Sequence, residues 1–409
     1  MKRSALSAIL AQGVQAGISF VLQLLVVRAL GLSEYGRFAV MYGILVLASG
    51  IVTGLVGDSL VALERDRRDI RAGLLGTMLI AAVGSATISS GILLVTGFID
   101  WPEAIAFAVA VAFFVIEEVF RRLLGANMKF HRILVIDSAG FVVALAVLGV
   151  ALLLHGLSLA VFFAAIGAGQ IFATLLGAVL VPKADRWMPG LWPGSYGAVF
   201  GYGTWRALVQ TLRPGMFTGV RLLVAAFVGL AAVGGLEAAR TYTSPLLLVV
   251  GGLSSFLFVR FAHQAKSQGA GSLHEADRVS RALLLATAVL GGLAVAVAPW
   301  IGPLLFGVHL DLVATAAWAV YGVSVAVVTP YGALSAVSGM QTPVFFIRLG
   351  DTLLGLVVTV GMLLLHIAPP YLPFGLAVAS ALGGFGLRWL SRRVKAKNRL
   401  PEPSVDFTE

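Results

Sequence analysis

Long apolar runs recur along the whole chain and constrain its fold more than any other feature. We count about twelve runs of roughly twenty residues, and a run of that length is sufficient for one helical crossing of a bilayer. Strands of a membrane β-barrel would instead alternate apolar and polar residues. The sequence therefore predicts an all-α polytopic membrane protein. The runs cover 7–30, 38–60, 73–98, 104–125, 133–155, 157–181, 199–230, 236–259, 282–300, 312–338, 343–367 and 371–390.

The basic residues predict the orientation of these crossings. The chain has 29 Lys and Arg against 19 Asp and Glu, a net charge of +10. Most of the basic residues fall in every second connecting segment, on the side of the N-terminus, which is the pattern of cytoplasmic loops. We therefore expect both termini in the cytoplasm, and we assign the positive charge to topology and not to a nucleic-acid partner. The absence of cysteine excludes disulfides and thiolate metal sites.

A segment rich in proline, glycine and tryptophan interrupts the pattern near the middle of the chain, at residues 181–194. Such residues mark a connection outside the helices. We therefore predict an N-terminal six-helix bundle (1–190), a C-terminal six-helix bundle (191–390) and a cytoplasmic tail (391–409). A glycine pattern around Gly31 recurs 198 residues later at Gly229, as expected for two parallel repeats.

The run at 199–230 carries polar residues that a membrane helix usually avoids. They are Arg206, Gln210, Arg213 and Arg221. An arginine in hydrocarbon is costly and is a functional candidate by default. The seven-residue spacing places Arg206 and Arg213 on nearly the same face, with Gln210 between them. We interpret this run as a cationic helix that lines a central cavity.

A second interpretation remains open for the same run. Residues 196–212 could form a helix on the membrane surface, with the crossing made by 215–233, and the arginines would then be interfacial anchors. Pro214 and Gly215 follow Arg213 directly. Because proline removes a helix hydrogen bond and glycine adds freedom, we predict a hinge there.

The first run has a polar stripe of its own. Gln12, Gln15, Ser19 and Gln23 are spaced three, four and four residues apart, so they share one helix face. Such a stripe either bonds neighbouring helices or forms a cavity wall, and three amides in one row favour the wall. We expect the helix to end in a short outside turn over residues 28–37.

Acidic residues within the runs fall close to basic ones. Spacings of three or four residues allow ion pairs along a helix, and Asp137 is expected at the same depth as the first two pairs. The predicted pairs are Glu117 with Arg121, Glu118 with Arg122, Glu237 with Arg240, and Arg348 with Asp351.

The segment Arg28-Ala29-Leu30-Gly31-Leu32-Ser33-Glu34-Tyr35-Gly36-Arg37-Phe38, following a polar first helix, resembles the opening of the Wzx-type polysaccharide flippases of the MOP (MATE-like) exporter superfamily. The segment from Phe200 through Arg221 to Gly229 is similar, more loosely, to the start of the second half of those proteins. The resemblance implies two six-helix bundles around a cavity that opens alternately inward and outward, in the bacterial cytoplasmic (inner) membrane. It implies a transporter and not an enzyme, without a cofactor or metal.

The cargo implied by the resemblance is an undecaprenyl-diphosphate-linked oligosaccharide. The resemblance is also compatible with association with polysaccharide assembly proteins. Arginine forks suit diphosphate oxygens because they form paired charge-assisted hydrogen bonds. We expect glutamines to face the sugar. The candidate diphosphate ligands are Arg206 and Arg213, then Arg221 and Arg28, with Gln210; the candidate sugar ligands are Gln12, Gln15 and Gln23.

Other functions remain open. A MATE-like drug or cation antiporter would need an acid in mid-membrane, whereas the acids here fall near helix ends. A polysaccharide polymerase or glycosyltransferase would need a sizeable outside loop to hold its catalytic groups, and the predicted outside turns are short. A major facilitator transporter would carry a basic loop motif of which only Gly54 and Asp58 match.

Overall fold

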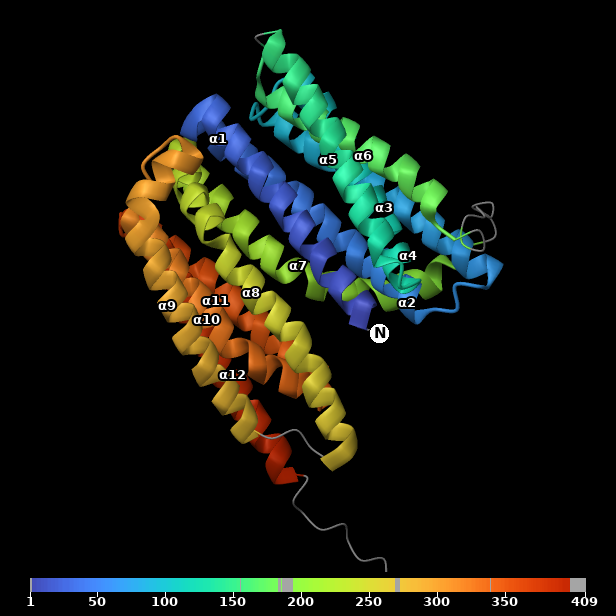
Figure 1. The fold of residues 1–409 in the computed structure, drawn as a ribbon, viewed down its shortest axis with the longest axis vertical. Helices are drawn as coiled ribbons and strands as arrows, with labels where there is room; N and C mark the ends of the chain where they lie inside the picture. The colour runs from blue at the N-terminus through green and yellow to red at the C-terminus, as the bar shows by residue number, and fades with distance from the viewer. Residues whose placement is uncertain are drawn as a thin grey trace, which may run out of the picture. The chain divides into compact units, whose positions relative to one another are not determined.

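A computed structural model describes residues 2–154, 156–182, 185, 194–268, 273–338 and 340–397, which form helices and no strand. Figure 1 shows their course. The elements are α1 (Lys2–Val52), the π-helix η1 (Thr53–Asp58), α2 (Ser59–Ala62), α3 (Arg68–Val95), α4 (Trp101–Ala126), α5 (Phe130–Leu153), α6 (Leu159–Leu180), α7 (Tyr196–Phe227), α8 (Leu230–Gln268), α9 (Leu273–Phe306), α10 (Leu312–Val337), α11 (Gln341–Leu364), the 3-10 helix η2 (Pro369–Tyr371) and α12 (Leu372–Lys397).

The 51 residues of α1 form two helices that fold back on each other. The reversal occurs at Gly31, whose φ of 78° and ψ of 178° are not helical and lie in a region open to glycine. Across the hairpin, the Tyr35 hydroxyl donates to Gln23 Oε1 at 3.1 Å. The Ser19 and Tyr42 hydroxyls are 2.9 Å apart. The predicted turn over residues 28–37 is therefore wrong in length, because helix resumes directly after one glycine.

Among the described residues, eight helical segments are long and apolar enough to cross a membrane. The first of them, Leu10–Ala62, contains two of the predicted runs. The three predicted runs outside these segments correspond to α4, α7 and α8. Helices α4 and α8 carry three of the four predicted ion pairs, and α7 carries the three arginines. The predicted class, an all-α polytopic membrane protein, is confirmed.

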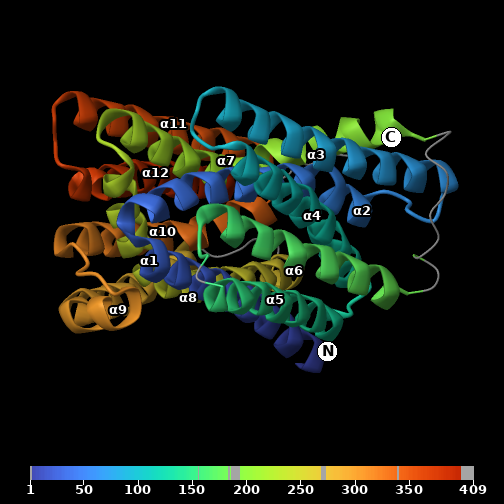
Figure 2. The same ribbon diagram turned by 90° about the horizontal axis from the view of Figure 1, so that it is seen from above.

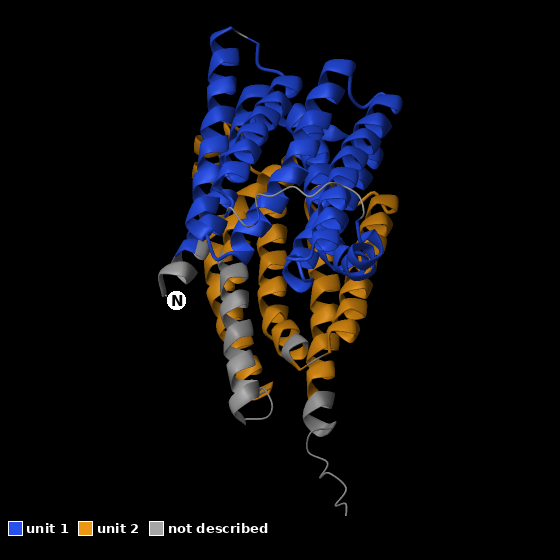
Figure 3. Ribbon diagram, turned by 90° about the vertical axis from the view of Figure 1, so that its right-hand side faces the viewer, with its two compact units in different colours: residues 1–234 blue, residues 235–409 orange. Residues whose placement is uncertain are grey.

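Two compact units divide the chain, Met1–Gly234 and Gly235–Glu409 (Figure 3). Helix α7 belongs to the first unit, where it packs against α1, η1 and α3. The predicted boundary at residue 190 and the end of the predicted tail, 398–409, lie outside the described residues. The division into bundles at 1–190 and 191–390 stays a prediction.

Helix pairing repeats within the two units. In the first unit α4 packs against α3 and α6, and α5 packs against α6 (Figure 2). In the second unit α10 packs against α9 and α12, and α11 packs against α12. The same order of partners, six helices later, agrees with the internal repeat suggested by the glycine pattern.

Aromatic side chains fill the core of the first unit between α1, α4 and α6. The ring of Phe163 lies 5.2 Å from that of Phe38 and 5.1 Å from that of Phe107, both between centroids. All three rings are fully buried or nearly so. Pairs at this separation add to the stability gained from burial alone, so α1 is held firmly beside α4 and α6.

Candidate functional site

Helix α7 approaches η1 closely at two glycines. A Cβ atom added to Gly54 would overlap the backbone of Ala207, and one added to Gly203 would overlap the backbone of Leu55. Small residues at such crossings allow helix backbones to approach each other. One turn beyond Gly203 on α7, Arg206 therefore lies within reach of the end of η1.

Asp58, the last residue of η1, receives two side chains of α7. Arg206 Nε donates to Asp58 Oδ2 at 2.7 Å, and Gln210 Nε2 donates to the same oxygen at 3.2 Å. The structure thus brings Arg206 and Gln210 together around one carboxylate, and their role as cargo ligands stays a prediction. Sequence reasoning missed this partner because Asp58 and Arg206 are 148 residues apart.

Arg213 is exposed on α7, two turns beyond Arg206. Its guanidinium carbon lies 5.9 Å from the centre of the Phe217 ring, at the distance of a cation–π contact. Helix α7 continues without a break through Pro214 and Gly215. The role of these two residues as a hinge stays a prediction.

Arg221, by contrast, is buried, with 7% of its surface exposed. A Cβ atom added to Gly43 of α1 would overlap its guanidinium group, and it would also approach the hydroxyl of Thr218. Arg221 therefore lies in the contact between α7 and α1, where a side chain at position 43 would displace it. Arg28 is exposed near the reversal of α1.

The three glutamines of the predicted stripe on α1 have different surroundings. Gln12 is exposed. Gln15 Oε1 accepts a hydrogen bond of 2.9 Å from Arg121 Nη2 of α4. Gln23 is buried and bonded to Tyr35 and to Ser19, its own neighbour one turn earlier. Two of the three amides thus form bonds inside the first unit, and sugar binding by this stripe stays a prediction.

Arg121 is the centre of a buried charged cluster in the first unit. Its guanidinium nitrogens lie 3.1 Å from Glu118, 3.7 Å from Glu117 and 3.2 Å from Asp137 of α5. Arg122 Nε lies 2.8 Å from Glu118 Oε1. The predicted pairing of both α4 glutamates with these arginines is confirmed, as is the approach of Asp137. Gln15 joins them from a position 106 residues away, a contact that spacing along one helix does not predict.

A further polar cluster lies in the second unit. Arg388 of α12 holds both carboxylate oxygens of Asp277 on α9, each at 2.9 Å, and the Tyr331 hydroxyl of α10 donates to Asp277 Oδ1 at 2.7 Å. The other predicted pairs are confirmed by contacts of 2.8 Å between Arg240 and Glu237 and 3.1 Å between Arg348 and Asp351. Within the described residues, no group of His, Cys, Asp or Glu side chains has the arrangement of a metal site.

Comparison with known proteins places this arrangement of helices in one fold. No protein-family model matches the chain, and no curated protein matches it. A solved structure of a multidrug resistance MATE family transporter of the MOP superfamily in its inward-facing conformation matches with a TM-score of 0.72 at 14% identity, over 96% of both chains. Its outward-facing counterpart matches with a TM-score of 0.68 at 13% identity, over 98% of this chain and 97% of that chain.

A third solved structure with this fold is described as having a binding pocket of different polarity. It is a MOP superfamily transporter from Pyrococcus furiosus, described as having a binding pocket of reverse polarity, with a TM-score of 0.68 at 12% identity over 97% of both chains. Identities this low establish the fold and nothing finer. The chain has the fold of the MATE-type transporters of the MOP superfamily.

Proposed function

We propose that this protein moves a lipid-diphosphate-linked oligosaccharide from the cytoplasmic to the outer leaflet, for surface polysaccharide biosynthesis, by alternating access. The observation that carries the proposal is the charge of α7. Over 32 residues this helix has three arginines and no carboxylate. A helix of that charge suits an anionic cargo, since arginine binds diphosphate oxygens in pairs. The reverse-polarity relative supports the idea that this fold can hold pockets of different charge.

In this proposal Arg213 is the first diphosphate ligand, because it is exposed along α7. Arg206 would change partner: Asp58 holds it at 2.7 Å, and an incoming diphosphate would compete with that carboxylate. Arg221 and Arg28 would contribute positive charge, and the exposed Gln12 would bind sugar hydroxyls. Pro214 and Gly215 would let α7 bend during the cycle.

Deletion of the gene tests the cargo. We expect surface polysaccharide to disappear while the lipid-diphosphate-linked oligosaccharide accumulates facing the cytoplasm, with both pools quantified in the same cells. Normal polysaccharide in the deletion strain would refute the proposal.

Substitution at Arg213 tests the site. Arg213→Ala should abolish transport at unchanged abundance in the membrane. Arg213→Lys should restore it only in part, because an ammonium group cannot form the paired contact. The control is Arg68→Ala, which removes an exposed arginine at the start of α3. Transport by Arg213→Ala equal to that of the control would exclude this role.

A second candidate function is that of a drug or cation antiporter. It is favoured by the three buried carboxylates around Arg121, because intramembrane acids often carry coupling ions, and by the multidrug transporters that share the fold. In this case the deletion strain would keep its polysaccharide and become sensitive to toxic organic cations.

A further inference from the structure

Three carboxylates lie in the charged cluster of the first unit, and two guanidinium groups contact them. Arg122 Nε lies 2.8 Å from Glu118 and balances it. Arg121 is left with two carboxylates, Glu117 at 3.7 Å and Asp137 at 3.2 Å. The side chains of Glu117 and Asp137 are only 5% and 6% exposed. Because a buried charge is costly unless it is paired, one negative charge of this cluster requires a further positive charge.

Glu118 has the donors that an ionised carboxylate needs. It accepts hydrogen bonds from Arg121 Nη1 at 3.1 Å and from Arg122 Nε at 2.8 Å. The hydroxyl of Thr53 on η1 donates to it at 3.2 Å. Three donors, two of them charged, favour the ionised form. The missing positive charge therefore belongs to the other two carboxylates, Glu117 of α4 and Asp137 of α5.

Glu117 and Asp137 compete for one N–H group. Glu117 Oε1 and Asp137 Oδ1 lie 3.7 and 3.2 Å from Arg121 Nε, which carries a single hydrogen. The other two nitrogens of Arg121 donate to Glu118 and Gln15. Glu117 Oε1 and Asp137 Oδ2 are buried without a hydrogen-bond partner among the described residues. A buried oxygen without a partner costs free energy, and a proton held between the two carboxyl groups would remove that cost.

The neighbouring helices do not supply the missing charge within the described part of the chain. The charged groups recorded around Glu117 are Arg121, Glu118 and Asp137. Helix α6 packs against α4 and α5 and has no charged residue over Leu159–Leu180. Helix α1 contributes the neutral amide of Gln15.

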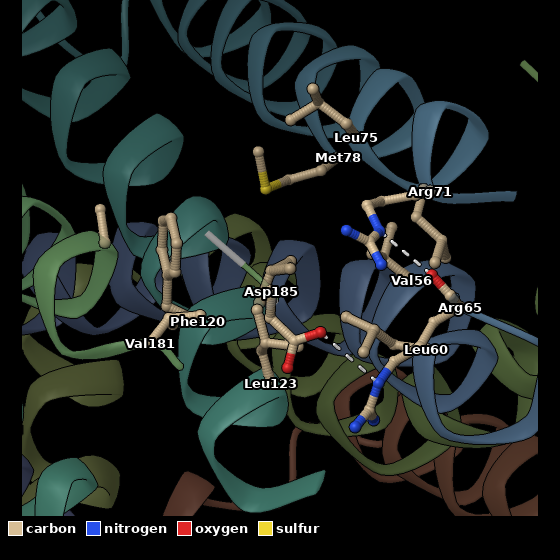
Figure 4. Close-up of a pocket in the computed structure, with 13 residues that line it drawn as sticks. Val56, Leu60, Arg65, Arg71, Leu75, Met78, Phe120, Leu123, Val181 and Asp185 are labelled. Carbon is tan, nitrogen blue, oxygen red and sulfur yellow. Dashed lines mark hydrogen bonds and ion pairs between the residues drawn. The ribbon is translucent and has the colours of Figure 1, made fainter. Parts of the chain in front are cut away.

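The charges next to α3 face another side of α4. Figure 4 shows Arg65, Arg71 and Asp185 around a cavity of about 120 Å³ that Leu123 of α4 also lines. Leu123 is two residues after Arg121, about 200° around the helix. Arg65 Nε lies 3.8 Å from Asp185 Oδ1, on that side. These groups therefore do not balance Glu117 and Asp137.

We propose that Glu117 and Asp137 bind one proton between them and form a proton-binding site within the first unit. The proton makes the positive and negative charges of the cluster equal. A metal ion would instead be repelled by Arg121, whose Nε lies 3.2 Å from Asp137. Release of the proton would leave two like charges facing one N–H group, and their repulsion would favour separation of α5 from α4. The inference holds for either cargo considered above, because it rests on the charges of the first unit alone.

Infrared spectroscopy of the purified full-length protein in lipid nanodiscs tests the proposal. A protonated carboxyl group has a C=O stretching band that a carboxylate lacks. We expect the wild type to show this band at neutral pH and to lose it in one step as the pH is raised, because the two groups titrate as a pair. Glu117→Gln and Asp137→Asn should each remove the band, since Arg121 balances the single carboxylate that remains.

The control is Glu237→Gln, because Glu237 is buried with an arginine of its own, Arg240, at 2.8 Å. This substitution should leave the band unchanged.

Three outcomes would overturn the proposal. A wild type without the band at neutral pH would show that no proton is bound, and this result needs no variant to fold. A band that persists in both Glu117→Gln and Asp137→Asn would place the proton elsewhere. Loss of the band when sodium chloride replaces choline chloride at constant pH would assign the site to sodium. The cargo is tested separately, by the deletion strain.

Discussion

Arg121 holds a buried position that depends on its neighbours. Its side chain is 8% exposed and lies against Glu117, Glu118 and Asp137. Arg121→Met would leave those carboxylates without their shared cation, which costs about 3–5 kcal/mol for a buried pair. We expect the free energy of unfolding in detergent to fall by that amount.

Arg122 provides the control because it binds the same Glu118 but is 43% exposed. Arg122→Met should cost about 1 kcal/mol or less, since exposed ion pairs contribute little. If both substitutions lowered the free energy of unfolding equally, burial of Arg121 would not be the cause.

The contact between Asp58 and Arg206 makes a second prediction at this scale. In a double-mutant cycle with Asp58→Asn and Arg206→Gln, the two changes should be coupled by about 0.5–3 kcal/mol in the free energy of unfolding, as for residues in direct contact. Additive effects would argue against a formed ion pair in the membrane. A cycle of Asp58→Asn with Arg213→Gln, whose arginine lies two turns further on, should show no coupling.

Residue pairs divide into those that sequence can predict and those that it cannot. Glu237 with Arg240 and Arg348 with Asp351 were predictable because three residues along a helix bring side chains together. The pairs of Asp58 with Arg206 and Asp277 with Arg388 join residues 148 and 111 positions apart. Those contacts depend on how helices pack, which a spacing rule does not contain.

At the scale of the element, the crossing of α7 and η1 rests on Gly203. Gly203→Ala places a methyl group on the backbone of Leu55, which cannot move as a flexible side chain would. We expect a loss of about 1–3 kcal/mol in the free energy of unfolding, as for other overpacked sites. Gly201→Ala, two residues away with nothing within 4 Å of the added atom, should be neutral or slightly stabilising. Equal effects of the two would refute the close crossing.

The sequence predicts where the helices lie, but it does not predict the geometry of the connections between them. Run length alone located α5, α6 and α10, because a bilayer demands a minimum apolar length. The sequence predicts an outside turn over residues 28–37, whereas the helix reverses at Gly31 alone. Arg37 instead bonds Glu34 and Glu103 at 3.0 and 2.7 Å, so these residues remain helical and pack against α4.

At the scale of the whole molecule, the absence of cysteine makes the predicted topology directly testable. Asp66→Cys, in the exposed loop before α3, and Thr96→Cys, in the exposed turn after α3, each introduce a single thiol. We expect an impermeant thiol reagent to label position 96 in intact cells and position 66 only after permeabilisation, because a crossing helix separates them. The opposite pattern would reverse the predicted orientation.

The fold depends on features that do not require particular residues, and for this reason it could be predicted from the sequence. For the same reason a solved transporter structure with only 14% sequence identity has the same fold. These features are the twelve apolar runs and the charges of the segments between them, and both remain when most individual residues are replaced by similar ones. The cargo was not predictable to the same degree, because it depends on a few polar groups whose availability changes with packing. Gln23 illustrates this, since the side chain expected to face sugar is bonded to Tyr35.

The contact between Asp58 and Arg206 depends on the number of residues in and before the π-helix η1, and not only on the identity of the two residues. A π-turn holds one residue more than an α-turn. Deleting one residue within Thr53–Gly57 would let an ordinary helix close over the gap and leave the direction of Asp58 nearly unchanged, because the π-turn absorbs the additional residue. Deleting one residue from the α-helix before it would instead rotate Asp58 by about 100°. A relative one residue shorter within η1 could therefore keep the pair of Asp58 with Arg206, while the same gap a few residues earlier would separate them, so the position of a gap in an alignment would decide whether this contact survives.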